Sequence, residues 1–125
     1  MGRVFWKTHT EGYFLLQESK VEGGHMTLDE FELFYDQMVE AEKKLLSSKG
    51  IEYSGKEDRF NNFNKLGTEL NLTPEKILWI YLKKHLDGIL SYINGEYTGG
   101  EPIMGRINDA RNYLALLAGM VAKTK

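Results

Sequence analysis

Three polar residues follow one another at three-residue spacing near the C-terminus: Arg106, Asp109 and Asn112. In a helix this spacing places the three side chains on one stripe, beside an apolar face. Facing helices of a bundle commonly build ligand or metal sites from such inward-facing polar groups. A weak surface pair between Arg106 and Asp109, with Asn112 half exposed, is the alternative.

A second polar group interrupts residues 79–93, WIYLKKHLDGILSYI, which are otherwise almost wholly apolar. A helix that is apolar on most faces is buried, so Lys84, His85 and Asp87 are expected to meet other protein groups or a ligand. His85 fits either a ligand site or a satisfied core position. Gly88 costs about 1 kcal/mol relative to alanine in a helix interior. Close approach of another helix or of a bound group would account for it.

A third group of polar and aromatic residues is YSGKEDRFNNF, residues 53–63. Tyr53 is suited to stacking on a base or to packing in a core. Asp58 would either cap a helix, the commoner use of aspartate there, or coordinate a metal. Arg59 is suited to gripping a phosphate through two parallel hydrogen bonds. Burying scattered polar groups separately costs more than gathering them, so we predict that the three groups form one pocket.

Helical patterns that must position these groups begin at Thr27, which forms a capping box with Glu30. The first helix is predicted to end near Ser47–Gly50, and the second to cover about 58–70. Thr73-Pro74-Glu75 opens a third helix that runs to about Asn94, and a fourth covers about 102–122. Short links between four amphipathic helices predict an all-α antiparallel bundle. The residues predicted to face the core are Leu28, Phe31, Phe34, Tyr35, Met38 and Val39, then Phe60, Phe63 and Leu66, then Ile103, Ile107, Ala110, Leu114, Leu117 and Val121.

Residues 1–25 differ from the rest and are treated as an N-terminal extension to a helical domain of residues 26–125. Aromatic and β-branched residues flank Thr10-Glu11-Gly12, which predicts a β-hairpin. The alternatives are a tag or an upstream-translated segment, with Met26 as the natural start.

Composition narrows the classes of function. The chain has 125 residues, 42% hydrophobic and 27% charged, which is the composition of one globular domain. A formal net charge of -2 argues against binding to a nucleic-acid backbone. There is no cysteine, which agrees with a cytoplasmic location and rules out thiolate metal sites. No apolar run is long enough for a bilayer, so no membrane partner is expected.

Three segments carry a resemblance: EYSGKEDRFNNF, LKKHLDGILSYI and EPIMGRINDARNYLALL. They resemble small phage and prophage proteins similar to the nucleotide modification associated domains, which are loosely related to the all-α MazG-type nucleoside triphosphate pyrophosphohydrolases. The resemblance covers about residues 45–122. It implies a nucleotide or nucleotide-derived ligand, a homodimer, and the host cytoplasm as location if the protein is phage-encoded. A third helix that is apolar on nearly every side also favours a dimer.

The resemblance further implies Mg²⁺ as cofactor, although the match is incomplete. MazG-type enzymes hold Mg²⁺ on the triphosphate with acidic residues at E-x-x-E and E-x-x-D spacing. Here the second pair matches Asp109 and Asn112, so an amide replaces one carboxylate. The earlier pair has no clean match and leaves only Asp87, beside Lys84 and His85. Mg²⁺ prefers several hard oxygen ligands, so this set is thin.

The predicted site combines these residues. The predicted catalytic residues are Asp109 and His85. The predicted ligand-binding residues are Tyr53, Arg59, Asn62, Lys84, Arg106 and Tyr113. The predicted metal ligands are Asp109, Asn112, Asp87 and Asp58, with Glu101 as a further candidate. Two functions stay open, Mg²⁺-dependent hydrolysis of a nucleoside triphosphate and non-catalytic binding of a nucleotide or nucleotide-derived signal. The third alternative is a structural or interaction protein whose polar patch fixes helix register.

Overall fold

The computed structural model describes residues 3–7, 13–17 and 24–124 of the chain, and its side chains from residue 24 onward. Four helices dominate this part of the chain, so the predicted all-α class is confirmed. None of the helices in the described ranges is long and apolar enough to cross a membrane.

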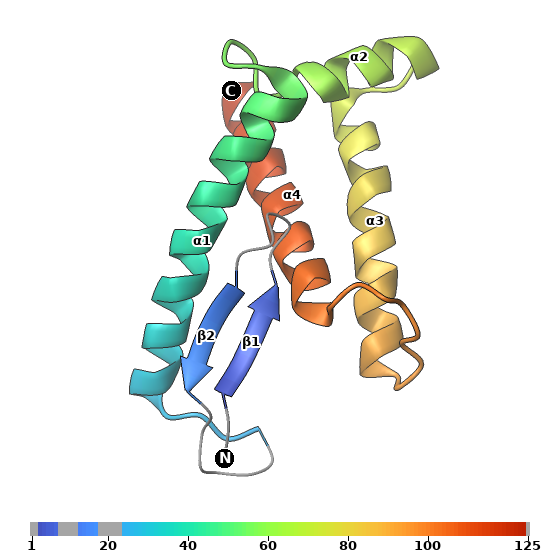
Figure 1. Ribbon diagram of the computed structural model, residues 1–125. Coiled ribbons are helices and arrows are strands. Elements are labelled where there is room, and N and C mark those ends of the chain that lie inside the picture. The colour runs from blue at the N-terminus through green and yellow to red at the C-terminus, as the bar shows by residue number, and fades with distance from the viewer. Residues whose placement is uncertain (1–2, 8–12, 18–23, 125) are drawn as a thin grey trace.

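Two short strands precede the helices. β1 (Arg3–Lys7) pairs antiparallel with β2 (Tyr13–Gln17), with Arg3 opposite Gln17 and Lys7 opposite Tyr13. β2 lies beside α1 (Leu28–Ser54) and β1 lies beside α4 (Ile103–Lys123) (Figure 1). The turn expected at Thr10-Glu11-Gly12 falls outside the described residues.

Helix α1 begins with the predicted capping box. Thr27 Oγ1 accepts from the Glu30 backbone N–H at 3.1 Å, and the Thr27 N–H donates to Glu30 Oε1 at 3.2 Å. The helix does not end near Ser47–Gly50 but runs to Ser54. Gly50 is buried, and a Cβ there would lie 2.8 Å from Arg59 Nε, so this glycine makes room for a side chain and does not end the helix. The chain turns instead at Gly55, whose φ of 77° favours glycine.

The remaining helices are α2 (Asn61–Leu70), α3 (Pro74–Ile93) and α4. The predicted start of α3 is confirmed, because Thr73 caps it by accepting from the Lys76 N–H at 3.3 Å. α3 and α4 are antiparallel neighbours, whereas α1 runs in the same direction as α4 (Figure 1). The short α2 lies across the end of the assembly where α1 finishes and α3 begins. The arrangement is therefore a helical assembly with one crossing helix and not a regular up-and-down bundle.

The hydrophobic core lies where α2, α3 and α4 meet. Its buried members are Phe63, Ile77, Leu78 and Met120. Partly buried Phe60 and Leu66 pack against it, as the sequence predicts for α2.

Two predicted core faces need correction. In α1, Met38 is buried, but Leu28, Phe31 and Tyr35 are exposed because the first half of this helix lies away from α2 and α3. In α4, Leu114 and Val121 are exposed, and the fully buried face carries Asn108, Asp109 and Ala110. Apolar periodicity misses this rotation because the opposite helix presents a polar partner, His85, to Asp109.

Candidate functional site

A cavity of about 390 Å³ lies among the four helices. This volume is in the range of about 300–1,000 Å³ that small-molecule sites occupy. The cavity brings together residues that are far apart in the sequence. The predicted site residues in its lining are Tyr53, Arg59, Asn62, Lys84, His85, Asp109, Asn112 and Tyr113, together with the further candidate Glu101.

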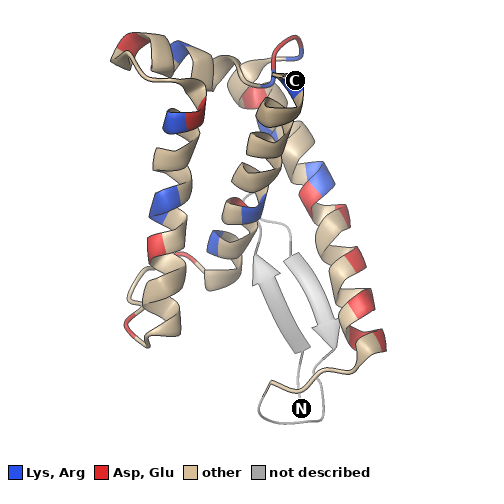
Figure 2. Ribbon diagram, turned by 180° about the vertical axis from the view of Figure 1, so that it is seen from behind, with Lys and Arg blue, Asp and Glu red and all other residues tan. Residues whose placement is uncertain are grey.

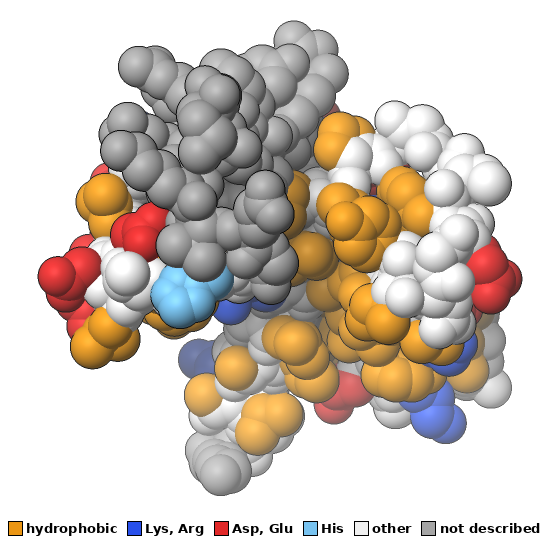
Figure 3. All heavy atoms as spheres, turned by 90° about the horizontal axis from the view of Figure 1, so that it is seen from below, with side chains coloured by type: hydrophobic (Ala, Val, Ile, Leu, Met, Phe, Trp, Pro, Cys, Tyr) orange, Lys and Arg blue, Asp and Glu red, His pale blue; other side chains and the backbone are white. Residues whose placement is uncertain are grey.

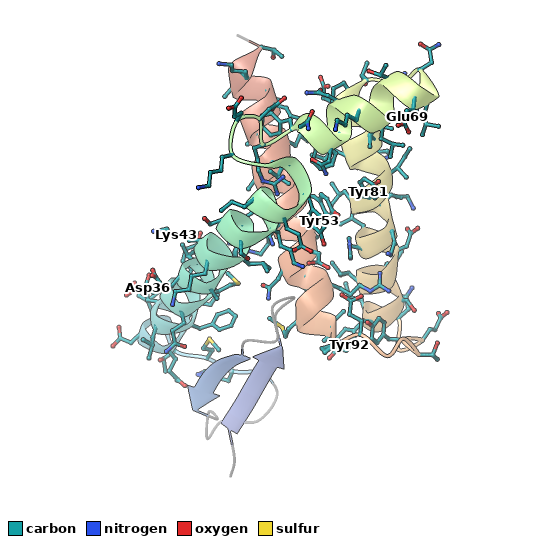
Figure 4. The ribbon with its side chains drawn as sticks, turned by 45° about the horizontal axis from the view of Figure 1, so that its top comes forward. Asp36, Lys43, Tyr53, Glu69, Tyr81 and Tyr92 are labelled. Atoms are coloured by element: carbon teal, nitrogen blue, oxygen red, sulfur yellow. The ribbon has the colours of Figure 1, made fainter. Side chains whose placement is uncertain are left out.

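Stacked aromatic rings form one side of the cavity. Tyr81 and Tyr113 are nearly parallel, with ring centroids 6.1 Å apart and an interplanar angle of 21°. Tyr113 also stacks on His85, at 5.7 Å and 27°. Phe63 meets Tyr81 edge-on at 6.2 Å, which joins the row to the core. Tyr53 comes from the last turn of α1 and lines the same cavity as Tyr81 of α3 (Figure 4).

Tyr113 is the central ring of this row. Burial raises the pKa of Tyr113 to about 12, and the nearby carboxylate of Asp109 adds to the rise. Tyr81 and Tyr53 act in the same direction, whereas the positive charge of Arg59 opposes it. The phenol is therefore neutral near pH 7 and can donate a hydrogen bond to a ligand.

His85 and Asp109 form a buried pair between α3 and α4. Their residues are 7% and 4% exposed, and His85 Nδ1 lies 3.5 Å from Asp109 Oδ2. Burial lowers the pKa of His85, while the charges of Asp109 and Glu101 oppose that shift. The imidazole is therefore neutral near pH 7 and presents one donor and one acceptor nitrogen.

Three cationic residues line the cavity, and each comes from a different part of the chain: Lys49 of α1, Arg59 ahead of α2, and Lys84 of α3. Lys49 also lies over the Tyr53 ring, 5.3 Å from its centroid. The acidic residues in the lining are Asp109 and Glu101. Much of the chain's negative charge lies elsewhere, on acidic residues that recur along α1 (Figure 2). The lining thus holds three cationic and two acidic residues, and one of the cations, Lys49, also pairs with Glu52 at 3.1 Å.

The Arg59 side chain lies against the α1 backbone at Gly50. Its side chain passes over Gly50, where a Cβ would lie 2.8 Å from Nε and 2.9 Å from Cδ. Its Nη1 atom is buried and has no hydrogen-bond acceptor among the described residues. Burial also lowers the pKa of Arg59, because desolvation disfavours the charged guanidinium. A bound anion would satisfy both the open donor and the desolvated charge.

Two amides complete the polar lining. Asn62 accepts from Ser54 Oγ at 2.6 Å, which fixes the start of α2 to the end of α1. Asn112 Oδ1 is buried and has no donor among the described residues. The lining therefore contains an open donor at Arg59 and an open acceptor at Asn112.

Three predicted site residues do not line the cavity. Asp87 pairs with Lys83 on the exposed side of α3, because two residues of helix turn its side chain away from that of His85. Asp58 accepts from the Phe60 N–H at 2.9 Å and from Asn64 Nδ2 at 3.3 Å, in the turn before α2. The N-cap of α2 is Phe60, so Asp58 neither caps this helix nor lines the cavity. Arg106 packs on Gly88, 3.1 Å from the position of a Cβ, so the close approach of a neighbouring helix accounts for that glycine.

The predicted Mg²⁺ ligands are accordingly not assembled. Asp109, Asn112 and the further candidate Glu101 line the cavity, with Glu101 beside Arg106, but Asp58 and Asp87 lie outside its lining and have other partners. Among the residues that the structure describes, no group of three His, Asp or Glu side chains is placed to hold a metal ion. This donor set does not fit the ion, so no chemical step is assigned to it.

Sequence reasoning missed Lys49 and Tyr81. Each lies four residues before a predicted site residue, Tyr53 or His85, and so shares its helical face. The sequence does not indicate Lys49 as a site residue, because the first helix is predicted to end near Ser47–Gly50. Tyr81 read as one more apolar residue of α3.

No protein-family model, curated protein or solved structure matches the chain.

Proposed function

We propose that the cavity binds a nucleotide or a nucleotide-derived small molecule and does not hydrolyse it. The observation that carries the proposal is the convergence of three cations from three parts of the chain beside the Tyr81–Tyr113–His85 stack. A nucleotide combines a planar base with phosphates. Aromatic faces stack on bases, and cationic side chains bind phosphate.

The two unfilled polar groups support the same class of ligand. A buried polar atom without a partner costs about 1–3 kcal/mol, so such atoms are uncommon unless something else satisfies them. Arg59 Nη1 lacks an acceptor, which a phosphate oxygen would supply. Asn112 Oδ1 lacks a donor, which an amino or ring N–H of a base would supply.

Binding is favoured over hydrolysis by the acidic residues of the cavity. Asp109 lies against His85, and Glu101 lies 3.3 Å from Arg106 Nε. Of the other carboxylates expected to hold Mg²⁺, Asp58 accepts hydrogen bonds in the turn before α2 and Asp87 pairs with the surface residue Lys83. The family resemblance of the sequence agrees with a nucleotide ligand, whether the protein hydrolyses the nucleotide or only binds it.

Adjacent lysines of α3 provide a matched test. Both Lys83 and Lys84 are exposed, but only Lys84 lines the cavity. Purified protein would be titrated with a panel of nucleotides by isothermal calorimetry. We expect Lys84→Gln to weaken the tightest nucleotide at least about tenfold, since a hydrogen bond to a charged group contributes about 1.5–3 kcal/mol. Lys83→Gln should change the affinity less than about twofold. Equal effects of the two variants, or no binding to the wild-type protein, would overturn the proposal.

Hydrolysis is examined in the same preparation. The nucleotides would be incubated with the protein and Mg²⁺, and the products separated by ion-exchange chromatography. Unchanged nucleotide is the expected result. Release of pyrophosphate that Asp109→Asn abolishes would establish the enzyme instead.

A further inference from the structure

Glu101 is one of the two acidic residues in the cavity lining. It lies in the loop between α3 and α4, and its side chain lines the cavity. Glu101 Oε2 is 3.3 Å from Arg106 Nε. Its charge also acts on His85, where it opposes the effect of burial on the pKa.

Arg106 lies behind this carboxylate and packs against α3. Its side chain is pressed against Gly88, and Nη1 donates to the Lys84 backbone carbonyl at 3.4 Å. The glycine is what allows the guanidinium to lie so close to α3, since a Cβ there would come within 3.1 Å of it. Arg106 thus contacts the Glu101 carboxylate directly, and Lys84 and His85 line the same cavity.

The contact between Glu101 and Arg106 is incomplete as a hydrogen bond. The Arg106 Nε atom is buried and donates no hydrogen bond, although the Glu101 carboxylate lies only 3.3 Å away. An ion pair without aligned hydrogen bonds gains little from its geometry. A better-placed anion could therefore replace Glu101 at small cost.

The Glu101 side chain is 35% exposed, so its carboxylate can turn toward solvent. The loop is fastened by Tyr97, whose hydroxyl donates to the Glu101 backbone carbonyl. Tyr97 in turn meets Tyr92 of α3 edge-on at 6.0 Å. The carboxylate can thus leave Arg106 while the backbone stays fastened.

We infer that Glu101 occupies a second anion position at the edge of the cavity, beside Lys84 and His85 of the lining and over Arg106 behind it, and that the ligand displaces the Glu101 carboxylate with a phosphate group. This inference rests on the proposed function and narrows it to ligands with more than one phosphate group. One phosphate is held on the Arg59 side of the cavity, and the other takes the position of Glu101. A nucleoside monophosphate fills only one of the two positions.

The probe for this position is inorganic tripolyphosphate, which has no base. We expect Glu101→Gln to bind it about three- to tenfold more tightly than the wild-type protein, because a competing negative charge is removed. Glu96→Gln removes the same charge from an exposed position in the same loop and should have less than a twofold effect. In an Arg106→Gln background the gain from Glu101→Gln should disappear.

The nitrogen signal of Arg106 Nε–H gives a second measurement that does not depend on variant stability. In ¹⁵N NMR spectra of the wild-type protein, tripolyphosphate should shift this signal, and inorganic phosphate at equal charge should shift it less. An equal gain from Glu101→Gln and Glu96→Gln, or an Arg106 signal that does not respond, would overturn the inference. If Lys84→Gln still weakens nucleotide binding in that case, the proposed function stands. If neither nucleotide nor tripolyphosphate binds, both fail.

Discussion

His85 Nδ1 of α3 lies 3.5 Å from Asp109 Oδ2 of α4, and both residues are buried. Typical N–H···O hydrogen bonds are about 2.7–3.2 Å long, so the two groups are close without forming a short bond. Asp109, Glu101, Arg106 and Lys84 all act electrostatically on His85. Burial outweighs the two acids and keeps the imidazole neutral in the folded protein.

The lowered pKa of His85 predicts a loss of stability in mild acid. The unfolded chain binds a proton near the ordinary value of 6.5, whereas the folded protein resists it. The stability that neutral His85 contributes is therefore fully present above pH 6.5 and declines as the pH falls toward the folded-state pKa. Denaturant unfolding between about pH 7.5 and 5.5 should show decreasing stability.

The matched variants of this prediction are His85→Gln and His25→Gln. His85→Gln should flatten the pH dependence, while His25→Gln, in an exposed position ahead of α1, should leave it unchanged. A wild-type slope that persists in His85→Gln would assign the effect to other groups.

Gly50→Ala should weaken nucleotide binding without unfolding the protein. Alanine favours the helix by about 1 kcal/mol, but the new Cβ requires Arg59 to move. Because Arg59 is a flexible side chain, we expect stability to stay within about 1 kcal/mol and affinity to fall about tenfold. Calorimetric titration and thermal melting measure the two effects. Gly100→Ala, whose Cβ meets nothing within 4 Å, is the control. Unchanged affinity in Gly50→Ala would remove Arg59 from the proposed binding role.

Deletion of residues 1–25 should leave the helical fold intact. The core of Phe63, Ile77, Leu78 and Met120 is formed by α2, α3 and α4, and none of these helices lies in the deleted segment. Circular dichroism should retain a helical spectrum and a cooperative melting transition. Loss of that transition would show that the N-terminal residues are part of the folding unit.

Association into a homodimer remains a prediction from the apolar character of α3. Trp79, Leu90 and Ile93 share one side of this helix and are exposed, Ile93 by 71%. Hydrophobic side chains also gather on the face seen in Figure 3. Light scattering at tens of micromolar should give twice the chain mass of 14.4 kDa.

A matched pair of charge substitutions tests which surface associates. Ile93→Glu should shift the protein toward the monomer, whereas Leu33→Glu, on an exposed position of α1, should not. A monomeric wild-type protein would end this prediction.

The sequence by itself determined the local features whose causes are local. The capping box at Thr27, the start of α3 at Thr73 and the inward face of α2 all depend on residues a few positions apart. The grouping of His85 with Asp109 was also within reach, because buried polar groups cost less when they meet.

Only the tertiary structure decided which polar groups face the cavity and where α1 ends. Gly50 marks a helix end in isolation, but the side chain of Arg59, nine residues later, covers it and the helix continues to Ser54. Arg106 and Asp109 share a stripe of α4, yet Asp109 lines the cavity while Arg106 packs on Gly88. Spacing along a helix shows only which side chains lie on the same side of it. Which of them reaches the cavity depends on how the neighbouring helices pack, including the space that a glycine such as Gly88 leaves for a side chain.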